Sequence, residues 1–160
     1  MTAEHRRDRA GMADIAMWFL MKKEMNIRKM MALCFLSELW SERLLKERIA
    51  PDAEFTTWGL GNAIPAWKTI EDTFPESLEM WLPHPVEHDR KRLRRIEKAL
   101  GSRRLELLED VMDTYGDYSS DDLEVLIHME SSWQKAEERE RRGKQRIISE
   151  EDMKEWKERQ

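Results

Sequence analysis

The segment from residue 26 to about residue 45 most constrains the fold, because a helix over it is apolar almost all the way round. Asn26 is suited to cap its start, and charged residues gather at its two ends. A helix that is apolar on every side is normally covered on every side, so we expect it to be the central helix. Its apolar positions are Ile27, Met30, Met31, Leu33, Cys34, Phe35, Leu36, Leu39 and Trp40.

Helical spacing of apolar residues elsewhere predicts further helices packed around this one. A helix is expected over residues 12–25. Gly101 is predicted to end a basic helix that begins at residue 87, because glycine readily takes the conformation that closes a helix. Toward the C-terminus, Ser119 and Ser149 are predicted N-caps, each with acidic residues in the turn that follows.

One stretch favours strand over helix. Pro51 and Asp52 predict a turn, and residues 55–58 are rich in side chains that favour extended backbone. We therefore expect one short β-hairpin over about residues 48–58, with residues 48–50 paired with residues 54–58. The predicted fold is mainly α: a flexible tail over residues 1–11 and a single compact helical domain over residues 12–160.

Composition limits the class of protein. The 160 residues are 40% hydrophobic and 38% charged, a balance typical of a soluble helical protein. The net charge of −5 argues against a dedicated nucleic-acid binder. Cys34 is the single cysteine, which rules out an intramolecular disulfide and favours a reducing compartment. No apolar stretch approaches the roughly 20 residues of a membrane span, so we expect a cytoplasmic protein without a membrane partner.

Few patterns suggest catalysis or metal binding. His84 and His88 are four residues apart, but Pro85 lies between them and no third ligand is near in sequence. His128 and Glu130 are two apart, a spacing that places side chains on different faces of a helix. We therefore expect a non-enzymatic protein with no catalytic residue, no metal and no cofactor.

Two charged runs are expected to be exposed helix faces. Residues 89–104 contain eight basic and two acidic residues, a local charge of +6, but no aromatic residue for base stacking lies among them. This favours solvent or an acidic protein partner over nucleic acid. Residues 137–142 are expected to form the i,i+4 pairs Glu137–Arg141 and Glu138–Arg142. The candidate patch for an anionic partner consists of Arg90, Arg92, Arg94, Arg95, Arg103 and Arg104.

Three segments resemble the Panacea domain family. Tyr115-Gly-Asp-Tyr-Ser119 through Leu123, then Leu126-Ile-His128-Met-Glu130-Ser-Ser-Trp133-Gln-Lys-Ala136, closely resembles its C-terminal signature, which reads approximately Tyr-Gly, Ser, Leu, then Leu-Thr-His-x-Glu-x-Pro-Trp and Ala. Ile27–Met31 resembles the Leu-Gln-Lys-Leu-Leu start of the family's second helix, and Phe55–Pro65 resembles its Ala-Trp-x-x-Gly-Pro-Val-x-Pro element. Asn62 and Ser132 replace prolines of the family pattern, which indicates a divergent member.

The resemblance covers about residues 12–157 and implies an antitoxin of the SocA-like type. Such proteins bind diverse toxins directly, and some deliver a toxin to a protease. We therefore expect a protein that binds and neutralises a toxin or effector protein. The alternatives are a phage-encoded regulator or anti-defence protein that binds a host protein, and a nucleic-acid-binding module using residues 90–104. The candidate partner-binding residues are Trp58, Asn62, Trp67, His128, Glu130 and Trp133, although buried structural roles for Trp58 and Trp133 remain open.

Overall fold

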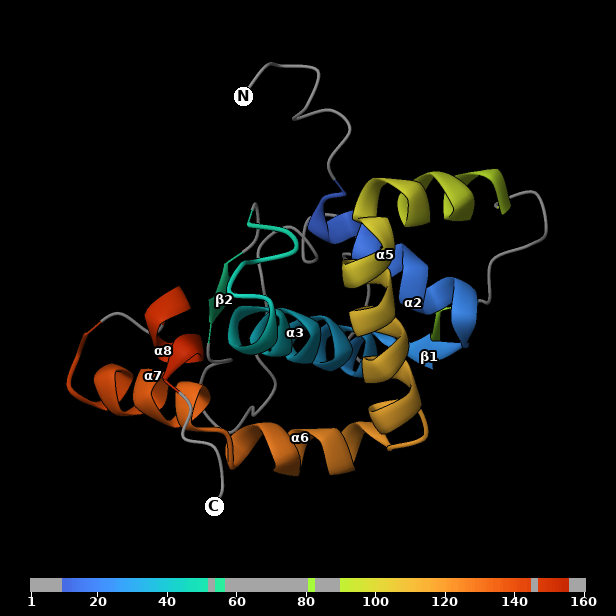
Figure 1. The fold of residues 1–160 in the computed structure, drawn as a ribbon. Helices are drawn as coiled ribbons and strands as arrows, with labels where there is room; N and C mark the ends of the chain where they lie inside the picture. The colour runs from blue at the N-terminus through green and yellow to red at the C-terminus, as the bar shows by residue number, and fades with distance from the viewer. Residues whose placement is uncertain (1–9, 52–53, 57–80, 83–89, 145–146, 156–160) are drawn as a thin grey trace.

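The computed structural model describes residues 10–51, 54–56, 81–82, 90–144 and 147–155, and it is mainly helical (Figure 1). The mainly α fold class predicted from the sequence is confirmed. The elements, in chain order, are α2 (Met12–Lys22), β1 (Met25–Asn26), α3 (Ile27–Leu44), β2 (Phe55–Thr56), β3 (Trp81–Leu82), α5 (Arg90–Tyr115), α6 (Ser120–His128), α7 (Ser131–Arg141), β4 (Ile147–Ile148) and α8 (Glu150–Lys154).

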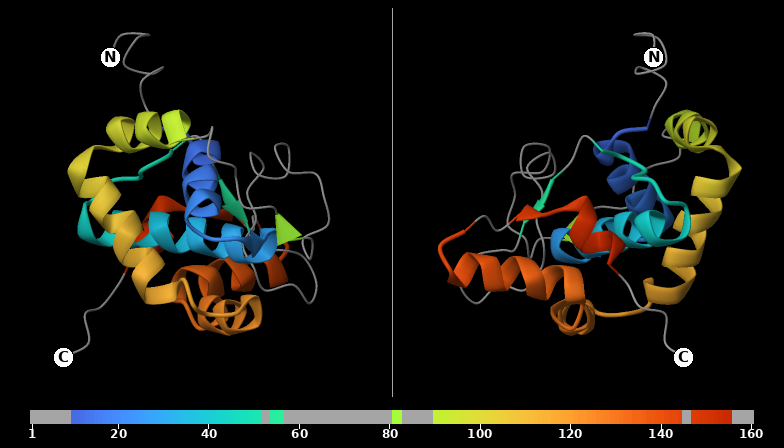
Figure 2. Two further views of the ribbon diagram at one scale, coloured as in Figure 1. Left: turned by 90° about the vertical axis from the view of Figure 1, so that its right-hand side faces the viewer. Right: turned by 60° about the vertical axis from the view of Figure 1, so that its left-hand side comes forward.

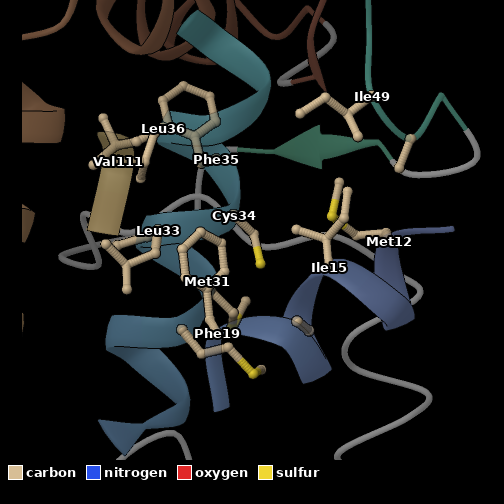
Figure 3. Close-up of a cluster of buried hydrophobic side chains, with 14 of the residues drawn as sticks. Met12, Ile15, Phe19, Met31, Leu33, Cys34, Phe35, Leu36, Ile49 and Val111 are labelled. Atoms are coloured by element: carbon tan, nitrogen blue, oxygen red, sulfur yellow. The ribbon is translucent and has the colours of Figure 1, made fainter. Parts of the chain in front are cut away.

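Helix α3 is the central element, as its apolar pattern predicts. Asn26 caps it, and its side chain accepts a hydrogen bond from the Lys29 backbone N–H at 2.8 Å. Its apolar residues from position 27 to position 39 are all fully or almost fully buried. Helices α2, α5, α6 and α8 pack against it (Figure 2). Figure 3 shows Met31, Cys34 and Phe35 of α3 among side chains of α2, with Ile49 and Val111 at the edges of the cluster.

Helix α5 is broken at Gly101, where the sequence predicts a helix end. Gly101 has φ of 80° and ψ of 168°, a conformation that glycine adopts without steric cost. The two parts of α5 therefore run in clearly different directions (Figure 1). The first part covers α2, and the second part packs on α3.

The predicted hairpin is wrong in its pairing. Strand β2 is present, but it pairs antiparallel with β4 near the C-terminus, with Phe55 opposite Ile148. Residues 48–50 do not form a strand because their polar groups bind α3. The Arg48 guanidinium pairs with Glu38, and the Ala50 N–H donates to Glu38 Oε1 at 3.0 Å. A second small sheet joins β1 to β3, with Met25 opposite Leu82 and Asn26 opposite Trp81.

The helices near the C-terminus begin at caps. Ser119 Oγ accepts a hydrogen bond from the Asp122 N–H at 3.1 Å, which starts α6 as predicted. Ser149 and Asp152 form a reciprocal capping box at the start of α8. Helix α7 begins at Ser131 with Glu130 as its N-cap residue, and the Glu130 side chain makes no capping bond. This leaves the Glu130 carboxylate available for another partner.

Candidate partner-binding site

Helices α6 and α7 meet in a corner (Figure 1), at residues 129–130. Two of the predicted site residues, His128 and Trp133, lie together there. The rings of His128, at the end of α6, and Trp133, in the first turn of α7, have centroids 4.3 Å apart with planes inclined by 39°. Gln134 Nε2 donates to the His128 carbonyl oxygen at 3.0 Å, which links the two helices. Trp133 is only 6% exposed, so it has the buried structural role that the sequence left open.

A groove of about 480 Å³ opens beside this ring pair. Residues 134, 137, 138 and 141 fall on one face of α7 because their spacing follows the helical repeat. Glu137 pairs with Arg141, and Glu138 pairs with Arg142, which confirms both predicted ion pairs. The groove thus combines two aromatic rings with an amide and two carboxylates. It is lined by His128, Trp133, Gln134, Glu137, Glu138 and Arg141.

Two large apolar side chains lie exposed close in sequence to His128, which lines the groove. Val125 of α6 is 59% exposed, and Met129, the C-cap residue one helical turn further on, is 73% exposed. The opposite face of α6 is buried through Leu123 and Ile127. Neither Val125 nor Met129 was predicted as a site residue. The sequence does show that they are four residues apart and offset from the core positions, which indicates a second apolar face. We call Val125, Met129 and the six groove residues the α6–α7 surface.

Glu130 lies at the same corner but points to the interior. It forms an ion pair with Arg43 of α3, whose side chain is 1% exposed. Arg43 Nε also donates to the Met153 carbonyl oxygen at 3.0 Å, and its guanidinium lies 5.4 Å from the centre of the Trp40 ring. The Trp40 indole in turn donates to the Tyr115 hydroxyl at 3.1 Å. Glu130 therefore joins the α6–α7 corner to α3 and α8.

Three buried polar atoms at the corner have no hydrogen-bond partner among the described residues: His128 Nε2, Ser132 Oγ and Trp133 Nε1. An unsatisfied buried polar group typically costs about 1–3 kcal/mol. Three such atoms within six residues distinguish this corner from the rest of the described chain. Ser132 is also one of the two positions where the sequence departs from the Panacea pattern.

The six arginines of the proposed anionic-partner patch divide into two groups. Arg104 pairs with Glu47, with Nη2 2.9 Å from Oε1, and Arg92 Nη2 lies 4.0 Å from Asp14 Oδ1. These two arginines hold α5 against neighbouring segments. The remaining four are exposed to solvent: Arg90, Arg94, Arg95 and Arg103.

An acidic stretch follows the basic one directly. Beyond Gly101, the second part of α5 exposes four carboxylates at helical spacing, and residues 105–115 contain no lysine or arginine. A polyanion on the basic part would therefore meet like charges close by, which limits the length of contact along α5. The four carboxylates belong to Glu106, Glu109, Asp110 and Asp113.

The other predicted positions give no site in the described part of the chain. Trp58, Asn62 and Trp67, and likewise His84 and His88, lie outside the described residues. Within the described ranges, no three His, Cys, Asp or Glu side chains are placed to hold a metal ion. Cys34 is fully buried, and burial raises its pKa well above the usual value, which keeps the thiol protonated.

Comparison with known proteins gives no independent assignment. No protein-family model matches the chain, and no match was found among curated proteins or among solved structures. The helices of the described residues include none long and apolar enough to cross a membrane. The resemblance to the Panacea domain therefore stays a prediction, and the function has to be argued from the α6–α7 surface.

Proposed function

We propose that this protein is a non-enzymatic, antitoxin-like protein that binds a toxin or another effector protein through the α6–α7 surface and neutralises it. The observation that supports this proposal is the exposure of Val125 and Met129 on the segment that leads to His128, which lines the groove. Methionine and aromatic side chains are enriched at protein interfaces, and methionine adapts well to a partner's shape. The class of partner comes from the resemblance to the Panacea signature, which runs through the same corner.

Helix α6 has the pattern of a helix that packs on two sides. Leu123 and Ile127 face α3, whereas Val125 and Met129 face outward without cover from the described residues. A helix that only needs to pack on its own core requires a single apolar stripe. The second apolar pair is therefore explained by a partner that covers it.

The size of the α6–α7 surface fits the centre of an interface. A stable protein complex buries about 800 Å² on each partner, which is more than eight residues of this surface supply. Most of the binding energy usually comes from a few central, well-packed side chains. We assign this central role to Met129, Val125 and the groove, with neighbouring polar residues at the rim.

Co-expression with the product of the adjacent reading frame tests the proposal. We expect the neighbour alone to arrest growth, and co-expression to restore growth and yield a complex that co-purifies. The double variant Val125→Ser/Met129→Ser should lose both effects. Leu44→Ser, at an apolar residue that is 55% exposed at the end of α3, is the matched control and should retain them. A neighbour that is harmless alone and does not co-purify contradicts the proposal.

A phage-encoded regulator or anti-defence protein would use the same surface on a host protein. In that case the adjacent reading frame encodes no toxin, and the Val125/Met129 variant loses a host partner instead. Gene neighbourhood distinguishes the two proposals.

Nucleic-acid binding through α5 is a further candidate, and the exposure of Arg94, Arg95 and Arg103 favours it. Contacts to phosphates would make the affinity fall steeply as salt rises. A mobility-shift titration with duplex DNA and single-stranded RNA, starting at about 50 mM salt, tests this function where electrostatic contacts are strong. The absence of a shift at that salt concentration removes it.

A further inference from the structure

We propose that the groove of the α6–α7 surface receives an arginine side chain from the partner, with apolar neighbours of that arginine packed on Val125 and Met129. This inference rests on the proposed function and names the chemistry of the partner segment. It predicts a basic, partly apolar segment of a protein rather than an acidic or purely apolar one.

The lining of the groove matches a guanidinium. Arginine is a planar cation on an apolar stem, and it both stacks on aromatic rings and donates to carboxylates in a fork geometry. The ring pair of His128 and Trp133 offers aromatic surface, and Glu137 and Glu138 offer the carboxylates. A guanidinium has five N–H donors, enough for both carboxylates at once.

The volume of the groove agrees with this occupant. About 480 Å³ lies toward the lower end of the range for sites that enclose a ligand. That space admits one long side chain with some solvent, but not a folded element of a partner. The partner backbone therefore has to run across the mouth of the groove, which brings its adjacent side chains to Val125 and Met129 on α6.

Entry of an arginine side chain into the groove breaks only weak ion pairs. The two carboxylates are bound to Arg141 and Arg142 of the same helix, and the Arg141 side chain is 77% exposed. Exposed i,i+4 pairs of this kind contribute little to stability. An incoming arginine therefore replaces weak local pairs, and it can also stack on the rings that line the groove.

The chain already holds arginines in this manner in its interior. Arg43 lies over the Trp40 ring and pairs with Glu130, and Arg48 lies over the Phe55 ring and pairs with Glu38. Both sites combine one ring, one carboxylate and one guanidinium. The groove presents rings and carboxylates at the surface, but its own arginine, Arg141, is largely exposed to solvent.

Charge around the surface also favours a basic segment. Asp121 and Asp122 lie exposed in the first turn of α6, below Val125. Asp121 is 3.5 Å from Arg28, and its side chain is 88% exposed, so its charge remains largely open to solvent. An acidic partner segment would be repelled by these exposed carboxylates.

Titration of the full chain with short peptides, followed by two-dimensional NMR, tests the inference. The probes are acetyl-Leu-Arg-Leu-amide, its citrulline analogue, which is nearly isosteric but neutral, and its lysine analogue. We expect the arginine peptide to shift the Trp133 indole signal and backbone signals of residues 125–141. It should bind about fivefold more tightly than the citrulline peptide and about threefold more tightly than the lysine peptide.

Matched variants locate the effect. Glu137→Gln/Glu138→Gln keeps the shape of the groove and should abolish the preference for arginine over citrulline. Glu106→Gln/Glu109→Gln, which removes two exposed carboxylates from α5, should leave that preference unchanged. Equal affinity for all three peptides, or shifts confined to residues outside 125–141, would overturn the assignment.

The outcome is separable from that of the proposed function. If the neighbouring protein co-purifies but Glu137→Gln/Glu138→Gln does not weaken the complex, only the arginine assignment fails. If the arginine peptide binds as described but no neighbouring protein is neutralised, the arginine assignment stands and the antitoxin proposal fails.

Discussion

Replacement of Glu130 by alanine should destabilise the fold strongly, because it removes a carboxylate that pairs with a buried cation. The Arg43 side chain is 1% exposed, and Glu130 is the carboxylate that pairs with it. Removing one partner of a buried ion pair typically costs about 3–5 kcal/mol. Two features moderate this cost: Arg43 Nε keeps its bond to the Met153 carbonyl, and Glu130 itself is 17% exposed, so water can enter. We therefore expect a loss of about 3 kcal/mol for Glu130→Ala.

The measurement is the free energy of unfolding from urea titration, followed by circular dichroism. Glu138→Ala is the matched control, because it removes a glutamate of an exposed pair on the same helix and should cost at most about 0.5 kcal/mol. In a second variant, Arg43→Met combined with Glu130→Ala should recover part of the loss, since no buried charge is left unpaired. If Glu130→Ala and Glu138→Ala unfold within about 0.5 kcal/mol of each other, the buried pair does not have the role assigned to it.

Three further substitutions test other features of the fold by the same unfolding measurement. Ser132→Ala removes a buried hydroxyl without a partner among the described residues and should stabilise the fold by about 1 kcal/mol; a loss would reveal a partner for it. Glu42→Gln should stabilise the fold at neutral pH, because burial raises the Glu42 pKa in spite of Lys154. Because the Glu42 pKa is raised in the folded state, the stability of the wild-type protein falls as the pH rises from the ordinary glutamate pKa through the folded-state pKa. The gain from Glu42→Gln should therefore vanish in acid. A difference between variant and wild type that does not depend on pH would contradict the reasoning. Gly101→Ala should lower the free energy of unfolding by about 2 kcal/mol, because alanine adopts the backbone conformation of Gly101 only with strain. An added Cβ would meet no atom within 4 Å, so this cost comes from the backbone alone. An unchanged stability would show that α5 straightens at no cost.

The sequence predicts those parts of the fold that depend on local chemistry. A helix that is apolar on every side has to be buried on every side, which places α3 at the centre. Asn26 and Ser119 cap their helices, as their short polar side chains predict. Gly101 likewise breaks α5 where its freedom at positive φ is needed. These features are decided within a few residues of the chain, so a single sequence is sufficient to read them.

Strand pairing could not be read in this way, because it depends on groups distant in sequence. Residues 48–50 had the right position for a hairpin strand, but Glu38, a buried carboxylate of α3, binds both Arg48 and the Ala50 N–H. That contact removes the backbone donor which a strand partner would have used. Phe55 then packs on Phe35, with ring centroids 5.2 Å apart, and its strand pairs with the distant Ile148.

The candidate site was partly predictable for the same reason. His128 and Trp133 stand out in the sequence, and the structure brings their rings together across the α6–α7 corner. The role of Glu130 was not readable, because Arg43 lies 87 residues away in sequence. Val125 and Met129 were overlooked because an apolar residue in a helix is normally assigned to the core. The packing of Leu123 and Ile127 confirms that Val125 and Met129 face outward.

The spacing of His128, Glu130 and Trp133 follows from the corner that they build. Glu130 has to reach inward to Arg43, and this fixes the chain between α6 and α7 against the centre of the domain. His128 and Trp133 are then held on either side of it with their rings in contact, and the bond from Gln134 to the His128 carbonyl closes the corner. A surface held in this way loses little conformational entropy when a partner binds, so more of the contact energy appears as affinity. The buried ion pair and the exposed groove are therefore parts of one arrangement. A substitution that frees Glu130 from Arg43 should weaken partner binding even though neither residue lines the groove.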